Sequence, residues 1–294
     1  MALNYNSPLE LRRFLDERGL GMRKRYGQNF LINGRARETL LDALGAGPGG
    51  PGGGRVWEIG PGLGAMTAGL LDRGALVTAF EIDPGFITVL RELFGARPGF
   101  SLIPGDVLKT WKTAPAHEGD YFLGNLPYTI AAVLLGDLIE GKRFFRRMVV
   151  TVQKEMARRM AARRGSPDYS SFSLLCGSAY TVRPLMELKG ASFYPEPRVD
   201  SQGVLLELRT DVDPRSYPGQ LYPLVRALFS SRRKTVKNNL RRYLAPRFPG
   251  SQADAQCGAV LQAAGISEMA RAETLMFDDF LALAQSLEAA RGNP

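Results

Sequence analysis

The residues best suited to chemistry stand together in the tetrapeptide NLPY, which is Asn125, Leu126, Pro127 and Tyr128. Pro127 confines Leu126 to extended backbone conformations and has no N–H of its own. The Asn125 side-chain oxygen and the Leu126 carbonyl can therefore face one point, where two acceptors suit an –NH₂ group. Tyr128 adds a flat face on which a base can stack. The alternative is a turn that ends a strand, with Tyr128 packed as core.

Two acceptors around one amine would serve nucleophilic attack. The exocyclic amine of adenine is a poor nucleophile because its lone pair is delocalised into the ring. Holding both of its hydrogens favours a pyramidal nitrogen and frees the lone pair toward an electrophile. No strong base is needed first, because the nitrogen can lose its proton after the bond forms. The single histidine, His117, lies in a predicted loop flanked by Pro and Gly, where we expect an exposed and uninvolved side chain.

A second centre lies in RVWEIGPGLG (55–64), where Gly60, Gly62 and Gly64 follow a short apolar run. The helical spacing of the next apolar residues predicts strand, tight turn and helix. Glycines allow the turn and let a ligand approach the backbone, and nucleotide-like ligands bind at such turns. Glu81 lies 21 residues beyond Gly60, where an acid can reach a ribose diol with its two oxygens. A turn without a ligand and an exposed strand-end carboxylate are the alternatives.

The elements that must position these groups read as an α/β fold. Besides the first strand, apolar segments predict strands at 75–83, which is rich in β-branched residues, and at 100–106, 120–128 and 146–153. Asp106 stands at the tip of the third strand and Asn125 near the end of the fourth. Acidic or amide residues at successive strand ends converge on one edge of a doubly wound sheet. Segments 172–181 and 203–209 predict further strands, added antiparallel at the sheet edge.

The remaining chain divides into a first domain, 1–210, and a helical second domain, 219–290, joined by a linker at 210–218. The first domain opens with a predicted helix at 8–18. A polar Gln28-Asn29 pair follows, which could be a loop or could bind a ligand. A helix at 35–44 and a glycine-rich connector at 45–54 come next.

The charge distribution favours a polyanionic partner. The net charge is +9, and residues 226 to 247 hold eight basic residues and no acid. We interpret this stretch as a nucleic-acid contact, with a merely solvated helix as the alternative. Cys176 and Cys257 are the two cysteines, so we expect no disulfide framework, no cysteine metal site and a reducing, cytoplasmic setting. The apolar runs are too short to span a membrane, and the first twenty residues do not read as a signal peptide.

Ordered motifs along nearly the whole chain resemble the small-subunit ribosomal RNA adenine dimethyltransferases. These motifs are YGQNFL (26–31), WEIGPGLGAMT (57–67), FEID (80–83), GDVL (105–108), GNLPY (124–128), VQKEMARRM (152–160), SFYPEPRVDS (192–201), SSRRKTVKNNL (230–240) and RAETL (271–275). The resemblance implies a Rossmann-like methyltransferase sheet with a small C-terminal helical domain. It also implies transfer of methyl groups from S-adenosylmethionine to the exocyclic amines of two adjacent adenosines, during small-subunit biogenesis.

The resemblance assigns roles to matching residues. Asn29 and Leu31 would edge the cofactor site, with Gly60 and Gly62 in its turn and Gly60 against the methionine portion. Glu81 would hold the ribose hydroxyls and Asp106 the adenine amine, while Asn125 would bridge cofactor and target base. Tyr128 and Phe193 would sandwich the flipped adenine. The contacts to RNA that we expect come from Arg232, Arg233, Lys234, Lys237 and Arg241. We expect a cytoplasmic monomer that acts on small-subunit RNA or the immature subunit, without a metal or a membrane.

Three other functions remain open from the sequence. A large-subunit adenine methyltransferase would resemble the first domain, but this chain has Leu126 where that group usually has Ile. A non-catalytic RNA-binding assembly or transcription factor could share the fold, although Glu81, Asp106 and NLPY are intact. A nicotinamide oxidoreductase would need a hydride-transfer constellation that is not visible. The segment PDYSSFSLL (167–175) lacks the Gly-Arg pair usual in that loop of the family, which leaves its contacts to RNA unassigned.

Overall fold

The structure is a computed structural model that describes residues 3–23, 26–46, 54–115, 120–127, 129–248 and 250–289. The chain divides into two compact units. One holds Met1–Ala157 and Thr181–Leu208, and the other holds Arg158–Tyr180 and Arg209–Pro294. Residues 158–180 thus group with the C-terminal unit, whereas the boundary expected from the sequence places them in the first domain. Among the described helices, none has the length and apolarity needed to cross a membrane.

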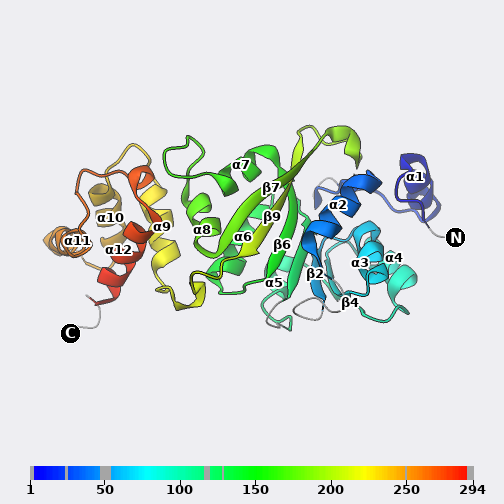
Figure 1. The fold of residues 1–294 in the computed structure, drawn as a ribbon, viewed down its shortest axis with the longest axis horizontal. Coiled ribbons are helices and arrows are strands. Elements are labelled where there is room, and N and C mark those ends of the chain that lie inside the picture. Colours follow the sequence, from blue (N-terminus) through cyan, green and yellow to red (C-terminus); the bar gives the residue numbers. More distant parts are fainter. Residues whose placement is uncertain are drawn as a thin grey trace. The chain divides into compact units, whose positions relative to one another are not determined.

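The first unit is built around a sheet in which seven described strands follow the order β4-β3-β2-β5-β6-β9-β7 (Figure 1). The strands from β4 to β6 run parallel, and β9 pairs antiparallel with β6. The chain order reverses between β2 and β5, and ligands bind at such switch points. The strands are β2 (Arg55–Ile59), β3 (Leu76–Glu81), β4 (Phe100–Pro104), β5 (Tyr121–Asn125), β6 (Arg147–Gln153), β7 (Tyr180–Leu188) and β9 (Ser201–Leu208).

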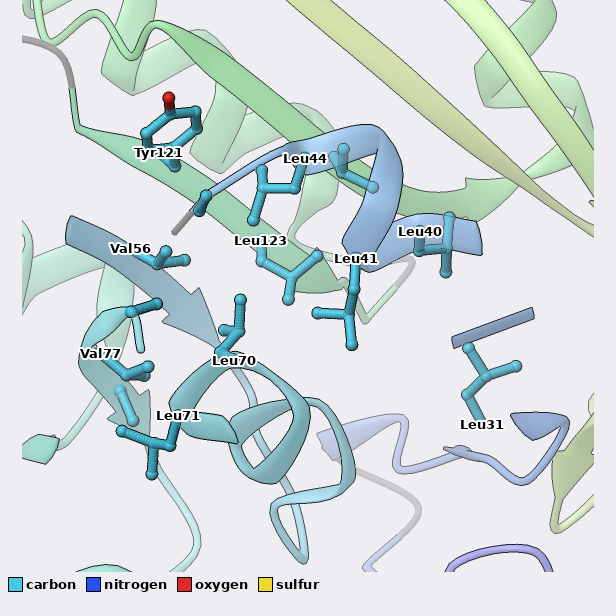
Figure 2. Packing of buried hydrophobic residues seen from close by; sticks show 14 of the residues in the cluster. Leu31, Leu40, Leu41, Leu44, Val56, Leu70, Leu71, Val77, Tyr121 and Leu123 are labelled. Atoms are coloured by element: carbon cyan, nitrogen blue, oxygen red, sulfur yellow. The ribbon is translucent and has the colours of Figure 1, made fainter. Parts of the chain in front are cut away.

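Both faces of the central strands are buried, as the apolar runs predict for a parallel sheet. Because side chains alternate along a strand, Val56, Val77 and Leu123 belong to one face. Figure 2 shows these residues with leucines of α2 (Gly34–Leu44) and α3 (Ala65–Asp72) in one apolar cluster. The opposite face carries an aromatic group, in which the ring of Trp57 lies 4.8 Å from that of Phe80 and 5.3 Å from that of Phe145. The predicted doubly wound sheet is confirmed.

Short polar residues start most helices of this unit. Side-chain oxygens of Ser7, Asn33, Asp83 and Asp106 each accept a main-chain N–H in the first turn of α1, α2, α4 and α5. The helices whose ranges have not yet been given are α1 (Pro8–Glu17), α4 (Pro84–Phe94), α5 (Val107–Thr110), α6 (Ala131–Glu140) and α7 (Lys154–Ala161). A separate two-stranded ribbon pairs β1 (Phe30–Leu31) with β8 (Phe193–Tyr194). The motif YGQNFL therefore ends in a short strand.

The strand predicted at 172–181 is wrong over most of its length. Residues Ser171–Ala179 form α8, and only Tyr180 onward is strand. The Ser170 hydroxyl accepts from the N–H of Ser173, and the Ser173 side chain accepts from the N–H of Ser170. This capping box starts a helix in a run whose apolar content fits either structure. The strand expected at 203–209 is confirmed as β9.

The second unit is helical, as the sequence predicts for residues 219–290. It contains α8, α9 (Leu221–Phe229), α10 (Val236–Leu244), α11 (Ser251–Ala263) and α12 (Phe277–Ala289). Phe229 at the end of α9 stacks on Phe280 of α12, with ring centroids 5.8 Å apart. The Tyr169 ring meets Phe229 edge-on at 5.8 Å. The segment before α8 thus packs on the same aromatic core.

Candidate active site

A cavity of about 310 Å³ lies in the first unit, where the turn after β2 meets the ends of β3 and β5. This volume is within the usual range for small-molecule sites. Eight of the residues proposed from the sequence line it: Asn29, Leu31, Gly60, Gly62, Glu81, Asp106, Asn125 and Pro127. Residues scattered over nearly a hundred positions are therefore brought to one site, at the sheet edge that the strand ends predicted.

The glycine turn leaves backbone exposed to the cavity. Gly60 has φ 65°, and a Cβ added there would meet no atom within 4 Å. Gly64 has φ 86°, and a Cβ there would lie 2.2 Å from the Phe94 ring, so a larger residue would displace the turn from α4. No side chain caps the start of α3. Its first N–H groups are therefore available to acceptors at the turn.

Glu81 is held by three main-chain N–H groups. Its Oε1 accepts from Ile82 and Asp83, both at 2.8 Å, and its Oε2 accepts from Gly62 at 3.3 Å. A carboxylate offers about four acceptor positions, so about one remains, on Oε2. Burial raises the pKa of Glu81 to about 7, although these hydrogen bonds oppose the rise. The geometry leaves room for one ligand hydroxyl without rearrangement, whereas the sequence suggested two.

Glu58 is a second buried carboxyl in the cavity wall, and sequence reasoning did not select it. Its Oε2 accepts from the Thr67 hydroxyl at 2.7 Å. Burial raises the pKa of Glu58 to about 7; the Thr67 hydrogen bond opposes this rise and the charge of Glu81 adds to it. The signal was present in the sequence, because Glu58 sits within an apolar strand two residues before the glycine turn. A carboxylate there is rare unless it has a function.

Asp106 both starts a helix and faces the cavity. Its Oδ1 accepts from the N–H of Leu108 at 3.0 Å, which caps α5. The other carboxyl oxygen has no hydrogen-bond partner among the described residues. Asp106 can therefore accept a hydrogen bond from a ligand while its orientation is fixed by the cap.

Asn125 is oriented by the motif that contains Asn29. The Asn125 Nδ2 donates to the main-chain oxygen of Asn29 at 2.7 Å. Since a carbonyl oxygen can only accept, the amide nitrogen must point to Asn29, which leaves the Asn125 side-chain oxygen as an acceptor. Gln28 has both ends engaged within the protein, with Arg23 N and Asp83 Oδ2. The Gln-Asn pair thus joins the N-terminal segment to the strand ends.

The other residues of the proposed base site are only partly assembled. Leu126 is buried and its N–H donates to Thr151 O, and it is not among the residues that line the cavity. Pro127 lines the cavity. Phe193 is 4% exposed, pairs with Leu31 across the small ribbon and packs in the apolar cluster, so the structure does not bring its ring into the cavity wall. Tyr128 and His117 lie outside the described residues.

The N-terminal segment supplies two lining residues that were missed. Tyr5 and Leu11 both line the cavity, and the Tyr5 hydroxyl donates to Leu63 O at 3.1 Å. Leu11 packs with Leu63 and Phe86 in a second apolar cluster. The amphipathic pattern of α1 predicts that Leu11 is buried, but a pattern gives no information on which cluster receives it.

The five cations proposed to contact RNA differ in the partners that their side chains have within the second unit. Arg232 donates to two main-chain carbonyls, Lys237 pairs with Glu268, and Arg241 pairs with Asp254 at 2.6 Å. Arg233 and Lys234 are exposed and pair with no described residue. The acid-free stretch is therefore partly neutralised by acids of other segments.

The described residues contain no group of three or more His, Cys, Asp or Glu side chains that could hold a metal ion. The acceptor set at the cavity instead suits hydroxyl and amine donors, such as those of a nucleoside.

Comparison with known proteins gives one consistent result. The family model described as ribosomal RNA adenine dimethylase matches residues 19–287. The chain is 42% identical over 284 residues to ribosomal RNA small subunit methyltransferase A of Treponema denticola, covering 95% of this chain and 94% of that protein. It is 46% identical over 288 residues to the protein of the same name from Treponema pallidum, covering 97% and 98%.

Solved structures agree with the sequence relatives. A dimethyladenosine transferase from Plasmodium falciparum superposes with a TM-score of 0.69 at 26% identity, covering 87% of this chain and 96% of that one. The 23S rRNA methyltransferase ErmE superposes with a TM-score of 0.59 at 23% identity, covering 88% and 99%. The second likeness shows the shared fold alone.

Proposed function

The chain belongs to the ribosomal RNA adenine dimethylase family, and from this premise we propose that it dimethylates the exocyclic amines of two adjacent adenosines in small-subunit ribosomal RNA. The methyl donor of this enzyme is S-adenosylmethionine. The single observation that carries the proposal is the meeting of Asn29, Glu81, Asp106 and Asn125 in one cavity of the switch-point sheet. These four residues occupy positions to which the family resemblance assigns contacts with the cofactor.

The cavity fits the cofactor on chemical grounds. Gly60 leaves open space where a ligand can approach the backbone. Glu81 has one acceptor position for a ribose hydroxyl, and Asp106 has a carboxyl oxygen for the adenine amine. Two buried carboxyls, Glu58 and Glu81, can balance positive charge in the bound molecule. When bound, S-adenosylmethionine supplies a methyl group on a positively charged sulfur, open to attack by a nitrogen lone pair.

The protein's part in catalysis is to hold the amine and the ring of the target base. The Asn125 oxygen accepts one amine hydrogen, and the bond from its nitrogen to Asn29 O keeps that oxygen in place. The Leu126 carbonyl would accept the second hydrogen only if the NLPY backbone turned it toward the cavity, which Leu126 does not line, and Tyr128 would stack on the ring. The proton leaves the nitrogen after the new N–C bond forms, so no buried base is required. Phe193 would complete the sandwich only if its ring leaves the apolar cluster.

Action on the small subunit is favoured over action on the large subunit. Both relatives above carry small-subunit names and align over nearly their whole length. The large-subunit enzyme shares the fold at 23% identity. Two buried free cysteines, Cys176 and Cys257, suit the reducing cytoplasm in which we propose the enzyme works.

Mass spectrometry of RNA tests the proposal. Small and large ribosomal subunits that lack dimethyladenosine are incubated separately with the protein and S-adenosylmethionine, and nucleosides are then quantified. We expect N6,N6-dimethyladenosine in the small-subunit RNA alone. Product confined to large-subunit RNA would support the rival methyltransferase, and binding without any product would support a non-catalytic RNA-binding protein.

A further inference from the structure

Arg232 is committed to contacts inside the second unit. Its Nη2 donates to the main-chain oxygen of Pro167 at 3.1 Å and to that of Tyr169 at 2.7 Å. Both hydrogens of this nitrogen are therefore used within the protein. The Nε of the same guanidinium lies 3.7 Å from the Glu273 carboxylate. Two of the five guanidinium N–H donors are thus used by main-chain carbonyls, and the Glu273 carboxylate offsets part of the charge.

Both carbonyls that accept from Arg232 belong to the loop between α7 and α8, residues 162–170. Two further contacts dock this loop. The Tyr169 hydroxyl donates to Leu275 O at 3.2 Å, and Arg164 Nη1 donates to Thr274 O at 3.2 Å. The loop is thus fixed to the turn before α10 on one side and to residues 274–275 on the other.

Three cations beside these contacts are uncommitted. Arg163 precedes the docked Arg164, while Arg233 and Lys234 directly follow Arg232. All three are exposed, and none has an ion pair or hydrogen bond from its side chain to a described residue. In each set, one cation (Arg164 or Arg232) holds the structure, and an adjacent cation is free to meet solvent or a partner.

We propose that Arg232 is a positioning residue that clamps loop 162–170 so that Arg163 joins Arg233 and Lys234 in one cationic surface for RNA phosphates. The inference rests on the proposed function for its partner, and it deepens that function by separating cations that touch RNA from the cation that holds them. The clamped loop includes residues 167–170 of the segment PDYSSFSLL, which would then act by placing Arg163.

Limited trypsin digestion of the free protein tests the clamp without RNA. Trypsin cuts after Arg163 and Arg164, and cutting requires the loop to open. Arg232→Ala removes two charge-assisted hydrogen bonds, so we expect cleavage there to be roughly tenfold faster than in the parent. Arg233→Ala, one residue away, is the matched control and should keep the parent rate. Equal cleavage rates in the two variants would overturn the clamp.

Salt titration of RNA binding tests the surface. Each lost phosphate contact lowers the slope of log affinity against log salt by about 0.7–0.9. We expect that decrease for Arg163→Ala, and a similar one for Arg232→Ala because Arg163 is no longer held. The double variant Arg163→Ala/Arg232→Ala should then resemble either single variant.

Additive losses in the double variant would show that Arg232 binds phosphate itself and would overturn its assignment as a positioning residue. An unchanged slope for Arg163→Ala would remove the loop from the surface. A parent chain without salt-dependent binding to small-subunit RNA would contradict the proposed function and this surface together, whereas the trypsin result would still report on the clamp alone.

Discussion

The cavity of the first unit and the basic stretch 226–247 of the second unit hold their polar groups in different ways. In the cavity, main-chain atoms orient the key side chains: three N–H groups donate to Glu81, one donates to Asp106, and a carbonyl accepts from Asn125. In the basic stretch, side chains from neighbouring segments pair with Lys237 and Arg241. The cavity is therefore preorganised, whereas the basic surface consists of those cations that are not paired with acids within the protein.

This difference shows where a local pattern determines function. Main-chain geometry follows from strand ends and glycines, which are local in sequence. Charge pairing depends on which distant acids the fold brings near. The following variants test each side of the contrast, in order of decreasing expected effect.

Asn125→Ala should have the largest effect, because it removes a preorganised acceptor. We expect the rate of methyl transfer to fall about 10²-fold, as one positioned acceptor contributes some 2.7 kcal/mol to the transition state. After the first methyl is attached, only one hydrogen remains on the nitrogen, so the first transfer should slow more than the second. Single-turnover assays that separate mono- from dimethyladenosine measure this. A variant that makes both products at the parent rate would refute the two-acceptor mechanism.

Glu81→Ala should weaken S-adenosylmethionine binding by about 1.5–3 kcal/mol, the range for hydrogen bonds to charged groups. Calorimetry of the folded variant measures the change. Glu92→Ala is a suitable control, because Glu92 lies on α4 and pairs with Arg18 at the surface. Unchanged affinity in Glu81→Ala would exclude this carboxyl from the cofactor site.

Glu58→Gln tests the electrostatics of the cavity through pH. The folded-state pKa of Glu58 is raised to about 7 from 4.5, so between these values the folded chain binds more protons than the unfolded chain. This contribution to stability is therefore complete below about pH 4.5 and is lost as pH rises through 7.

The glutamine side chain can keep the Thr67 hydrogen bond but does not titrate. We therefore expect Glu58→Gln to match the parent near pH 4.5 and to be more stable at pH 8 by on the order of 2 kcal/mol. Urea unfolding at the two pH values measures this difference. A difference that does not change with pH would mean that Glu58 keeps an ordinary pKa.

Much of the fold and the cavity could be predicted from local patterns. The strand ends at Glu81, Asp106 and Asn125 meet as expected, because alternation and β-branched runs identify parallel strands well. The sequence prediction missed helix α8 because the apolar run was interpreted as a strand. The Ser170 and Ser173 capping box, which indicates a helix start, is present in the sequence.

Other features depend on tertiary contacts that no local pattern encodes. The partner of the Asn125 amide lies 96 residues away in the chain. Phe193 is placed by its pairing with Leu31, which puts its ring in the apolar cluster. Tyr5 reaches the cavity only because α1 packs beside Leu63. For the same reason, counting acids between 226 and 247 could not show that Glu268 and Asp254 approach from outside the stretch.

The smallest effect is expected where cations are already paired, and it bears most directly on the contrast between the two regions. Lys237→Ala/Arg241→Ala removes as much charge as Arg233→Ala/Lys234→Ala, and exposed ion pairs contribute only about 0–1 kcal/mol to folding, so both variants should fold. If pairing governs contact, the second variant should lower the salt slope of RNA binding by about 1.4–1.8, the value for two phosphates, and the first by less than about 0.7. Equal losses in the two variants would mean that RNA displaces Glu268 and Asp254 from their partners. The net charge of the stretch, and not the pairing in the free protein, would then decide which residues bind.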